Sequence, residues 1–222
     1  MKKRISIFIG AIVIILAAVI GWNYYSSSQK SATNTATKTI KSNKVAKKGK
    51  NSKVLVVYFS RTQGVYGGDL KVGNTARVAQ FIQKYTKGDS YEIIPKKAYP
   101  ANYEKTTKIA QKEQDDNARP AIKNALPNVK KYSTIFIGSP IWWGEYPMIV
   151  RTFLDNEDLN GKTVIPFTTA EGSGLGNTTE TLKKTYPKAK VRKGFTEEGD
   201  TVKNNPKSVQ KEVNKWLKGL GY

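Results

Sequence analysis

The sequence predicts a three-layer α/β domain, built on a doubly wound five-stranded parallel sheet, behind a transmembrane helix and a disordered linker. Three observations predict it. From residue 53 to 222, short apolar segments alternate with segments of helical periodicity, which is the pattern of a parallel sheet covered on both faces. Residues 1–22 contain one long apolar run. Residues 23–52 are polar, contain little to bury and are expected to be disordered.

The N-terminal segment has the features of a membrane anchor. The 18 residues Ile5–Trp22 have one polar side chain, Ser6. As a helix this run would span about 27 Å, close to the thickness of the bilayer core. Met1–Arg4 is basic, which favours a single-pass orientation with the N-terminus in the cytoplasm and the domain outside the cell membrane. A cleaved signal peptide is the alternative, and it would leave the same domain secreted.

The charge of the chain is high and uneven. Ten of the 38 Lys and Arg residues, and none of the 17 Asp and Glu residues, lie in the first 52 positions. The remainder therefore has 28 basic and 17 acidic side chains, a net charge of +11. Its Lys residues are scattered along helices, and no nucleic-acid-binding motif occurs. We therefore expect acidic partners or an anionic surface, and no binding to nucleic acid.

The chain contains neither Cys nor His. This excludes disulfides, thiol nucleophiles, imidazole acid–base chemistry and zinc sites built from these residues. Redox chemistry in such a chain requires a bound cofactor. No catalytic side chain and no metal ligand are predicted.

The predicted elements of the domain alternate along the chain. The first strand is nearly continuous in apolar residues, and the helix after it has apolar residues at helical spacing. The second helix is polar and ends before Pro120, and Pro206 favours the start of the last helix. The strands are Lys53–Phe59, Tyr91–Ile94, Thr134–Gly138, Thr163–Phe167 and Ala189–Arg192, and the helices are Thr75–Lys87, Tyr103–Asn117, Met148–Leu154, Thr178–Tyr186 and Pro206–Leu220.

The loop after the first strand has the composition of an anion site. It consists of two polar parts around an excursion over residues 63–72, namely Ser60, Arg61 and Thr62, then Gly73, Asn74 and Thr75. Hydroxyls and backbone N–H groups that converge on a helix N-terminus favour an anion such as phosphate. A glycine-rich turn that only caps the helix is the alternative.

Two further loops follow the third and fourth strands. The loop Gly138–Pro147 contains adjacent Trp142 and Trp143. Sequence neighbours point in different directions, so core packing alone does not explain both, whereas a planar ligand would. One Trp packed beneath the sheet edge stays an alternative. The loop Thr168–Gly176 is rich in glycine, which allows the backbone to approach a flat ligand.

With these three loops the chain resembles flavodoxins, which bind the phosphate of FMN with a Ser/Thr-x-Thr-Gly-Asn-Thr loop. The SRT of 60–62 and the GNT of 73–75 look like the two halves of that loop, and a flavodoxin-like subgroup has both such an insertion and the IWWG of 141–144. The resemblance covers residues 53–222 and implies strand order 2-1-3-4-5 and non-covalently bound FMN. The cofactor-binding residues it implies are Ser60, Arg61, Thr62, Gly73, Asn74, Thr75, Pro140, Ile141, Trp142, Trp143, Gly144, Thr169, Glu171, Gly172 and Ser173.

Glu171 has two interpretations. Near a flavin its carboxylate would disfavour the anionic reduced form and lower the reduction potential, and otherwise it is a solvated loop acid.

The resemblance implies an electron carrier between a membrane donor and an external acceptor. The main alternative is an FMN-dependent NAD(P)H or quinone oxidoreductase, with Tyr66 of the excursion in a substrate pocket. The other is a flavin-free surface module that binds anionic polymer through basic residues.

Overall fold

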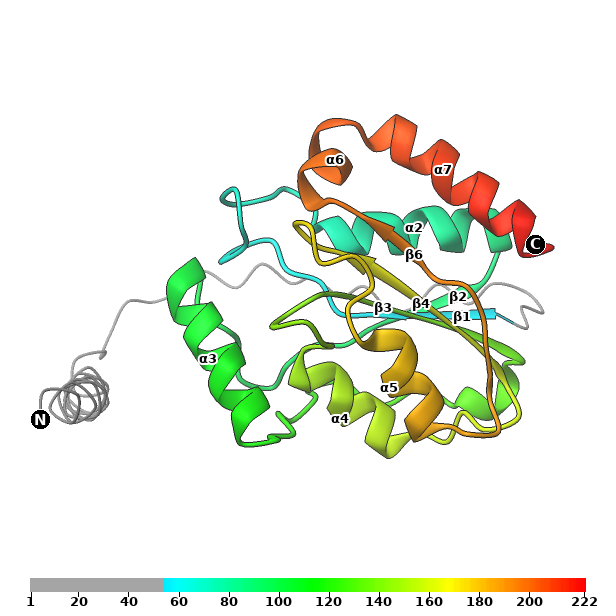
Figure 1. The fold of residues 1–222 in the computed structure, drawn as a ribbon, viewed down its shortest axis with the longest axis horizontal. Helices are drawn as coiled ribbons and strands as arrows, with labels where there is room; N and C mark the ends of the chain where they lie inside the picture. Colours follow the sequence, from blue (N-terminus) through cyan, green and yellow to red (C-terminus); the bar gives the residue numbers. More distant parts are fainter. Residues whose placement is uncertain (1–53) are drawn as a thin grey trace, which may run out of the picture. The chain divides into compact units, whose positions relative to one another are not determined.

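The computed structural model describes residues 54–222, and the predicted anchor (1–22) and linker (23–52) lie outside the described residues. The described part is a three-layer α/β domain, as the sequence predicts (Figure 1). Within residues 54–222, no helix is both long enough and apolar enough to cross a membrane.

Parallel strands form the middle layer of the domain. In chain order they are β1 (Val54–Tyr58), β2 (Asp89–Glu92), β3 (Thr134–Pro140), β4 (Thr163–Thr169) and β5 (Lys190–Val191). Their order in the sheet is β2-β1-β3-β4-β5, which confirms the predicted order. The register of the central pair sets Val56 opposite Phe136. Four of the five residues of β1 are buried, because neighbouring strands and both helical layers surround it, and this explains its unbroken apolar run.

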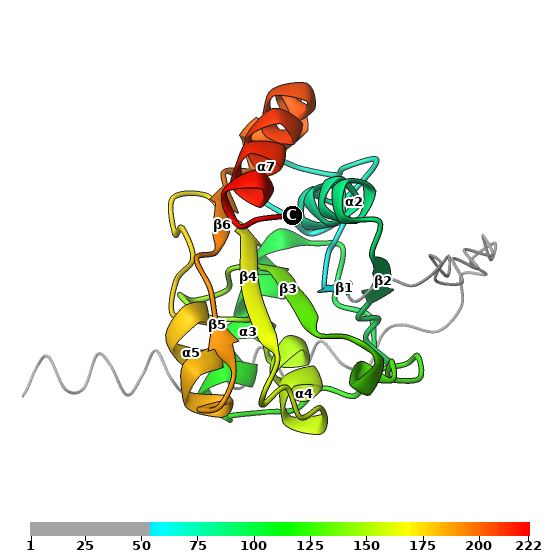
Figure 2. The ribbon, with the colours of Figure 1, turned by 90° about the vertical axis from the view of Figure 1, so that its right-hand side faces the viewer.

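Helices cover both faces of the sheet. They are α2 (Asn74–Thr86), α3 (Tyr103–Asp115), α4 (Met148–Asn156), α5 (Thr178–Thr185), α6 (Gly199–Asn204) and α7 (Pro206–Gly219), with a 3₁₀ turn η2 (Val129–Lys131). Figures 1 and 2 show α2 and α7 on one face and α4 and α5 on the other. Alternate strand residues face opposite layers, so Val57 packs in one apolar cluster with Phe153 of α4, and Val56 packs in the other with Val213 of α7.

The position beyond β4 holds two short strands where the sequence predicts one. β5 pairs with the first two residues of β4, and β6 (Phe195–Glu197) pairs in parallel with the last three. The carbonyl oxygen of Val164 accepts a hydrogen bond from Arg192 N (3.0 Å). The N–H of Ala170, just after β4, donates to Glu197 O of β6 (3.2 Å), so alternate residues along this stretch bond toward this edge. Pro166 has the same orientation along the strand as Val164 and Ala170, and it has no N–H to donate. This missing donor coincides with the break between β5 and β6.

All ten predicted elements are present, with ends that differ by a few residues. The sequence analysis missed β6, α6 and η2. Each of these is short, and the segment of β6 and α6 buries few apolar side chains, chiefly Phe195 and Val202. A short polar stretch has too little periodicity to separate it from a loop.

The topology opens a crevice at one edge of the sheet. β1 and β3 are neighbours, yet the chain passes from β1 to β2 on one side before it returns to β3 on the other. The loops that leave the carboxyl ends of β1 and β3 therefore diverge, and ligands of doubly wound sheets bind at this switch point.

Candidate functional site

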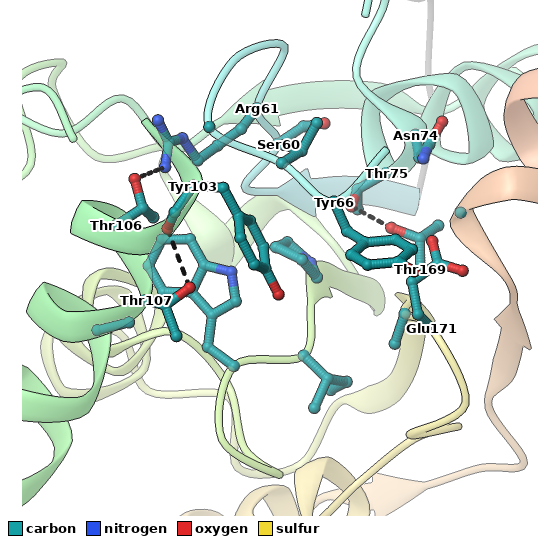
Figure 3. Close-up of a pocket in the computed structure, with 18 of the residues that line it drawn as sticks. Ser60, Arg61, Tyr66, Asn74, Thr75, Tyr103, Thr106, Thr107, Thr169 and Glu171 are labelled. Carbon is teal, nitrogen blue, oxygen red and sulfur yellow. Dashed lines mark hydrogen bonds between the residues drawn. The ribbon is translucent and has the colours of Figure 1, made fainter. Parts of the chain in front are cut away.

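The three predicted loops surround one cavity at this switch point, with a volume of about 570 Å³ (Figure 3). The volume lies within the range of small-molecule and cofactor sites. α3 contributes a further wall. Eleven of the fifteen residues predicted to bind cofactor line the cavity: Ser60, Arg61, Asn74, Thr75, Pro140, Ile141, Trp142, Trp143, Thr169, Glu171 and Ser173.

Ser60 joins the end of β1 to the first turn of α2. Its Oγ accepts a hydrogen bond from the backbone N–H of Ala76 (3.0 Å), and so caps a helix whose N-cap residue, Gly73, has no side chain. Gly73 permits this approach, because a Cβ there would overlap Ser60 Oγ. The first turn of α2 contains no acidic residue. No side chain of this turn therefore neutralises the positive end of the helix dipole, and this end can attract an anionic ligand.

Arg61 is a half-buried cation in the cavity wall. Its guanidinium donates to Thr106 Oγ1 (2.9 Å) and to Pro100 O (2.6 Å), and lies 5.5 Å from the centre of the Tyr99 ring. Figure 3 shows the bond to Thr106, which ties the first loop to α3. Burial lowers the pKa of the Arg61 guanidinium, and the group remains charged at neutral pH. Within residues 54–222 no carboxylate lies within 4.0 Å of it, so the cavity has a positive charge available to an anion.

A buried hydrogen bond joins the first and third loops. Thr75 Oγ1 and Thr169 Oγ1 are 2.7 Å apart, and both residues are less than 5% exposed. Figure 3 shows this bond at the end of the cavity near Asn74. Each hydroxyl keeps capacity for a further bond. The pair holds the anion end of the cavity together.

The second loop turns sharply at the two Trp residues. Trp142 and Glu145 exchange two backbone hydrogen bonds, of 3.0 and 3.1 Å, which closes a two-residue turn. Its central residues, Trp143 and Gly144, both have positive φ, 51° and 79°. Positive φ at both positions matches a type I′ turn, which suits glycine and strains a bulky residue such as Trp. Strained backbone of this kind concentrates at functional sites.

The turn sends the two Trp side chains to different surroundings. Trp142 packs its ring edge against Phe59 (5.6 Å between centroids) and Tyr99 (5.0 Å), at the margin of the core and in the cavity wall. Trp143 is 50% exposed, and its indole N–H donates to Thr107 O of α3 (3.1 Å). One Trp is therefore fixed by the core, and the other is held at the rim by α3.

Glu171 of the third loop reaches the start of α6. Its carboxylate oxygen lies against the backbone of Gly199, and the N–H groups of Gly199 and Asp200 favour its charged form. Partial burial raises the pKa of the Glu171 carboxyl, the charges of Asp200 and Glu198 add to the rise, and the two backbone N–H groups oppose it. A Cβ at Gly199 would lie within 3.0 Å of both Glu171 Oε1 and Asn74 Nδ2. The carboxylate and the Asn74 amide are thus at most about 6 Å apart, at the N-terminus of α2.

Comparison with known proteins identifies the family. A flavodoxin family model matches residues 53–219. The chain belongs to the flavodoxin family. No match was found among curated proteins.

Solved structures of similar proteins include flavoproteins. A candidate flavoprotein from Bacteroides uniformis is 34% identical, with a TM-score of 0.61, and the match covers 76% of this chain and 99% of that chain. A second, from Bacteroides eggerthii, is 33% identical, with a TM-score of 0.59, and covers 78% and 99%. A flavoprotein from Lactobacillus acidophilus in complex with FMN is 23% identical, with a TM-score of 0.50, and covers 68% and 95%. At 23% identity, the similarity to the Lactobacillus acidophilus protein shows a common fold only.

Four predicted residues of this flavodoxin domain lie outside the cavity lining. Thr62 is exposed, and its carbonyl oxygen accepts a bond from Leu70 N (2.7 Å) that closes the excursion. Gly73 is buried behind Ser60, and Gly144 and Gly172 supply positive φ in the two other loops. These four residues shape the backbone of the three loops and are not among the residues that line the cavity.

The sequence analysis missed the wall formed by α3. The lining residues of α3 are Tyr103, Thr106, Thr107 and Ala110, at spacing i, i+3, i+4 and i+7. That spacing marks one face of a helix, and it was overlooked because the face is only weakly apolar. Tyr66 of the excursion contacts Tyr103 edge-on (6.1 Å), and Figure 3 shows both rings at the cavity.

Proposed function

We propose that this flavodoxin binds FMN without a covalent bond and carries electrons between a membrane donor and an acceptor outside the cell. One observation supports this proposal most. The N-terminus of α2, which has no acidic residue in its first turn, and the turn that contains Trp142 and Trp143 line the same cavity. The first suits a phosphate, and the second suits a planar ring. A flavoprotein of similar fold, from Lactobacillus acidophilus, was solved in complex with FMN.

The cavity residues fit the three parts of FMN. Ser60 supplies a hydroxyl at the N-terminus of α2, and Arg61 supplies a positive charge elsewhere in the same cavity wall. Asn74 Oδ1 is a buried acceptor with no hydrogen-bond partner among the described residues, and a ribityl hydroxyl would satisfy it. Ile141 and Trp142 offer apolar and aromatic surface for the ring system. Bound FMN would supply the redox chemistry, and these residues would bind and orient it.

Membrane attachment is part of the proposal. The apolar run of residues 5–22 would anchor the chain, and the polar residues 23–52 would let the domain reach both donor and acceptor. A protease added to intact cells should then digest the domain. Survival in intact cells with digestion after lysis would contradict this topology.

An FMN-dependent oxidoreductase is the second candidate. Tyr66 and Tyr103 are 61% and 47% exposed at the cavity, and such rings could hold a planar substrate such as a quinone or a nicotinamide. Steady turnover of NAD(P)H with a quinone, by the FMN-loaded protein, would favour this candidate over a carrier.

A flavin titration tests the main proposal. Residues 53–222 are a suitable segment for this titration. The match to the Bacteroides uniformis flavoprotein uses 76% of this chain and covers 99% of that chain, so a domain of about this length folds there. FMN added to this domain should give a perturbed absorbance band that dithionite bleaches reversibly without oxygen. If FMN stays free at micromolar protein, the electron-transfer proposal fails and a flavin-free surface module becomes the better account.

A further inference from the structure

We propose that Glu171 weakens the preference of this cavity for FMN over riboflavin, because it sets a negative charge beside the phosphate end. The inference rests on the FMN binding proposed above. It concerns a residue that the flavodoxin phosphate-loop pattern does not include.

The geometry is set by the contact between the third loop and α6. Glu171 lines the cavity, and its carboxylate oxygen lies against the backbone of Gly199 at the start of α6. The absence of a side chain at Gly199 lets Glu171 and the Asn74 amide approach one another. Asn74 is the first residue of α2, so the carboxylate lies next to the N-terminus where a phosphate would bind.

No ion pair among the described residues neutralises this carboxylate. Asp200 and Glu198, from the segment that starts α6, face Glu171 and are both acidic. Asn74, from α2, is neutral. Lys203 of α6 donates to Gly67 O of the excursion (3.1 Å). Within residues 54–222 Glu171 has no ion pair shorter than 4.0 Å.

The effect should depend on charge and on phosphate. An ionised carboxylate repels a phosphate anion, and the repulsion is modest because Glu171 is exposed to solvent through the open cavity. Riboflavin has no phosphate, so its affinity should not depend on the charge of Glu171. The raised pKa of Glu171 means that the carboxylate is neutralised as the pH falls through that pKa, and the repulsion is then lost.

Binding of both flavins to residues 53–222 tests the inference. At pH 8, Glu171→Gln should lower the Kd of FMN by roughly three- to tenfold, and should change the Kd of riboflavin by less than about twofold. Gln keeps the size of the side chain and an acceptor oxygen for the α6 N–H groups. The advantage of the variant for FMN should shrink at pH 5. Protonation of the phosphate to its monoanion in the same range also weakens the repulsion, so both titrations reduce the advantage of the variant.

Glu212→Gln is the matched control, because it removes one exposed carboxylate from α7, outside the cavity lining. It should leave both Kd values unchanged. An unchanged or weaker FMN affinity in Glu171→Gln, with FMN still bound by the unaltered domain, would overturn the inference alone. An equal gain for riboflavin would also overturn it. Failure of the unaltered domain to bind either flavin would overturn the proposed function as well.

Discussion

Replacing Gly138 with Ala should destabilise the domain, because the added methyl group would clash with the ring of Phe167. Gly138 of β3 lies opposite Phe167 of β4 in the sheet register. A Cβ at Gly138 would overlap three carbons of the Phe167 ring, which is fully buried. Overpacking of a dense core costs about 1–3 kcal/mol. The obstacle is a rigid ring, so we expect the upper end, about 3 kcal/mol.

A second substitution shows whether the ring is the obstacle. Phe167→Leu alone should cost about 1–3 kcal/mol, since it leaves a cavity. In the double variant the added methyl group enters the vacated space, so the total cost should fall below the sum of the two by at least about 1 kcal/mol. Urea unfolding of residues 53–222 at 25 °C measures each free energy, and an unchanged m-value supports two-state behaviour.

Additive costs would refute this reasoning. Distant sites add within about 0.5 kcal/mol, so a double variant at the simple sum would mean that Phe167 does not obstruct residue 138. Gly219→Ala is a suitable control, because a Cβ there meets nothing within 4 Å and the residue ends α7. It should leave stability unchanged or slightly higher.

Three further predictions concern the site and the sheet. Replacing Trp142 and Trp143 together with Ala should weaken FMN binding at least tenfold, about 1.4 kcal/mol, and an unchanged Kd would remove the stacking assignment. Ser60→Ala deletes the cap of α2 and should cost about 1 kcal/mol in urea unfolding, and no cost would show that Ser60 does not cap the helix. Burial and the bond to Asp89 raise the pKa of Tyr132 to about 12. That pKa lies above the unfolded value near 10, so the contribution of Tyr132 is complete below pH 10 and is lost as the pH approaches 12. Tyr132→Phe should therefore lose less stability than the unaltered domain between pH 9.5 and 11.5, and equal losses would contradict the assignment.

The fold was predictable because its central strands carry strong signals. β1 and β3 are buried, so β1 is a continuous run of apolar and aromatic residues and β3 has an apolar run at 135–137. The helices that cover them have apolar residues at helical spacing. The sequence indicates that one hydrogen bond along the fourth strand is missing, since Pro166 in TVIPF removes a donor from a strand with neighbours on both sides. The side to which that donor would point depends on the register, which sequence alone does not supply.

The site was predictable in part. Loops at the carboxyl ends of parallel strands meet at one edge, so their polar and aromatic residues could be grouped before any coordinates. The contacts that connect these loops were not predictable. Thr75 and Thr169 are 94 positions apart, and their bond depends on the packing of the finished sheet. The approach of Glu171 to Asn74 depends likewise on Gly199, in a helix that the sequence did not indicate.

The broken fifth strand has a consequence for how copies of this protein behave when crowded together. A long uninterrupted edge strand offers a row of N–H and C=O groups to which another chain can add. Here the edge is divided into pieces of two and three residues, and Lys190 and Lys193 project from it as exposed cations. Neither piece is long enough to template a neighbouring strand, and the charges repel a like edge. We therefore expect the divided edge beside Pro166 to pair poorly with the edge of another copy.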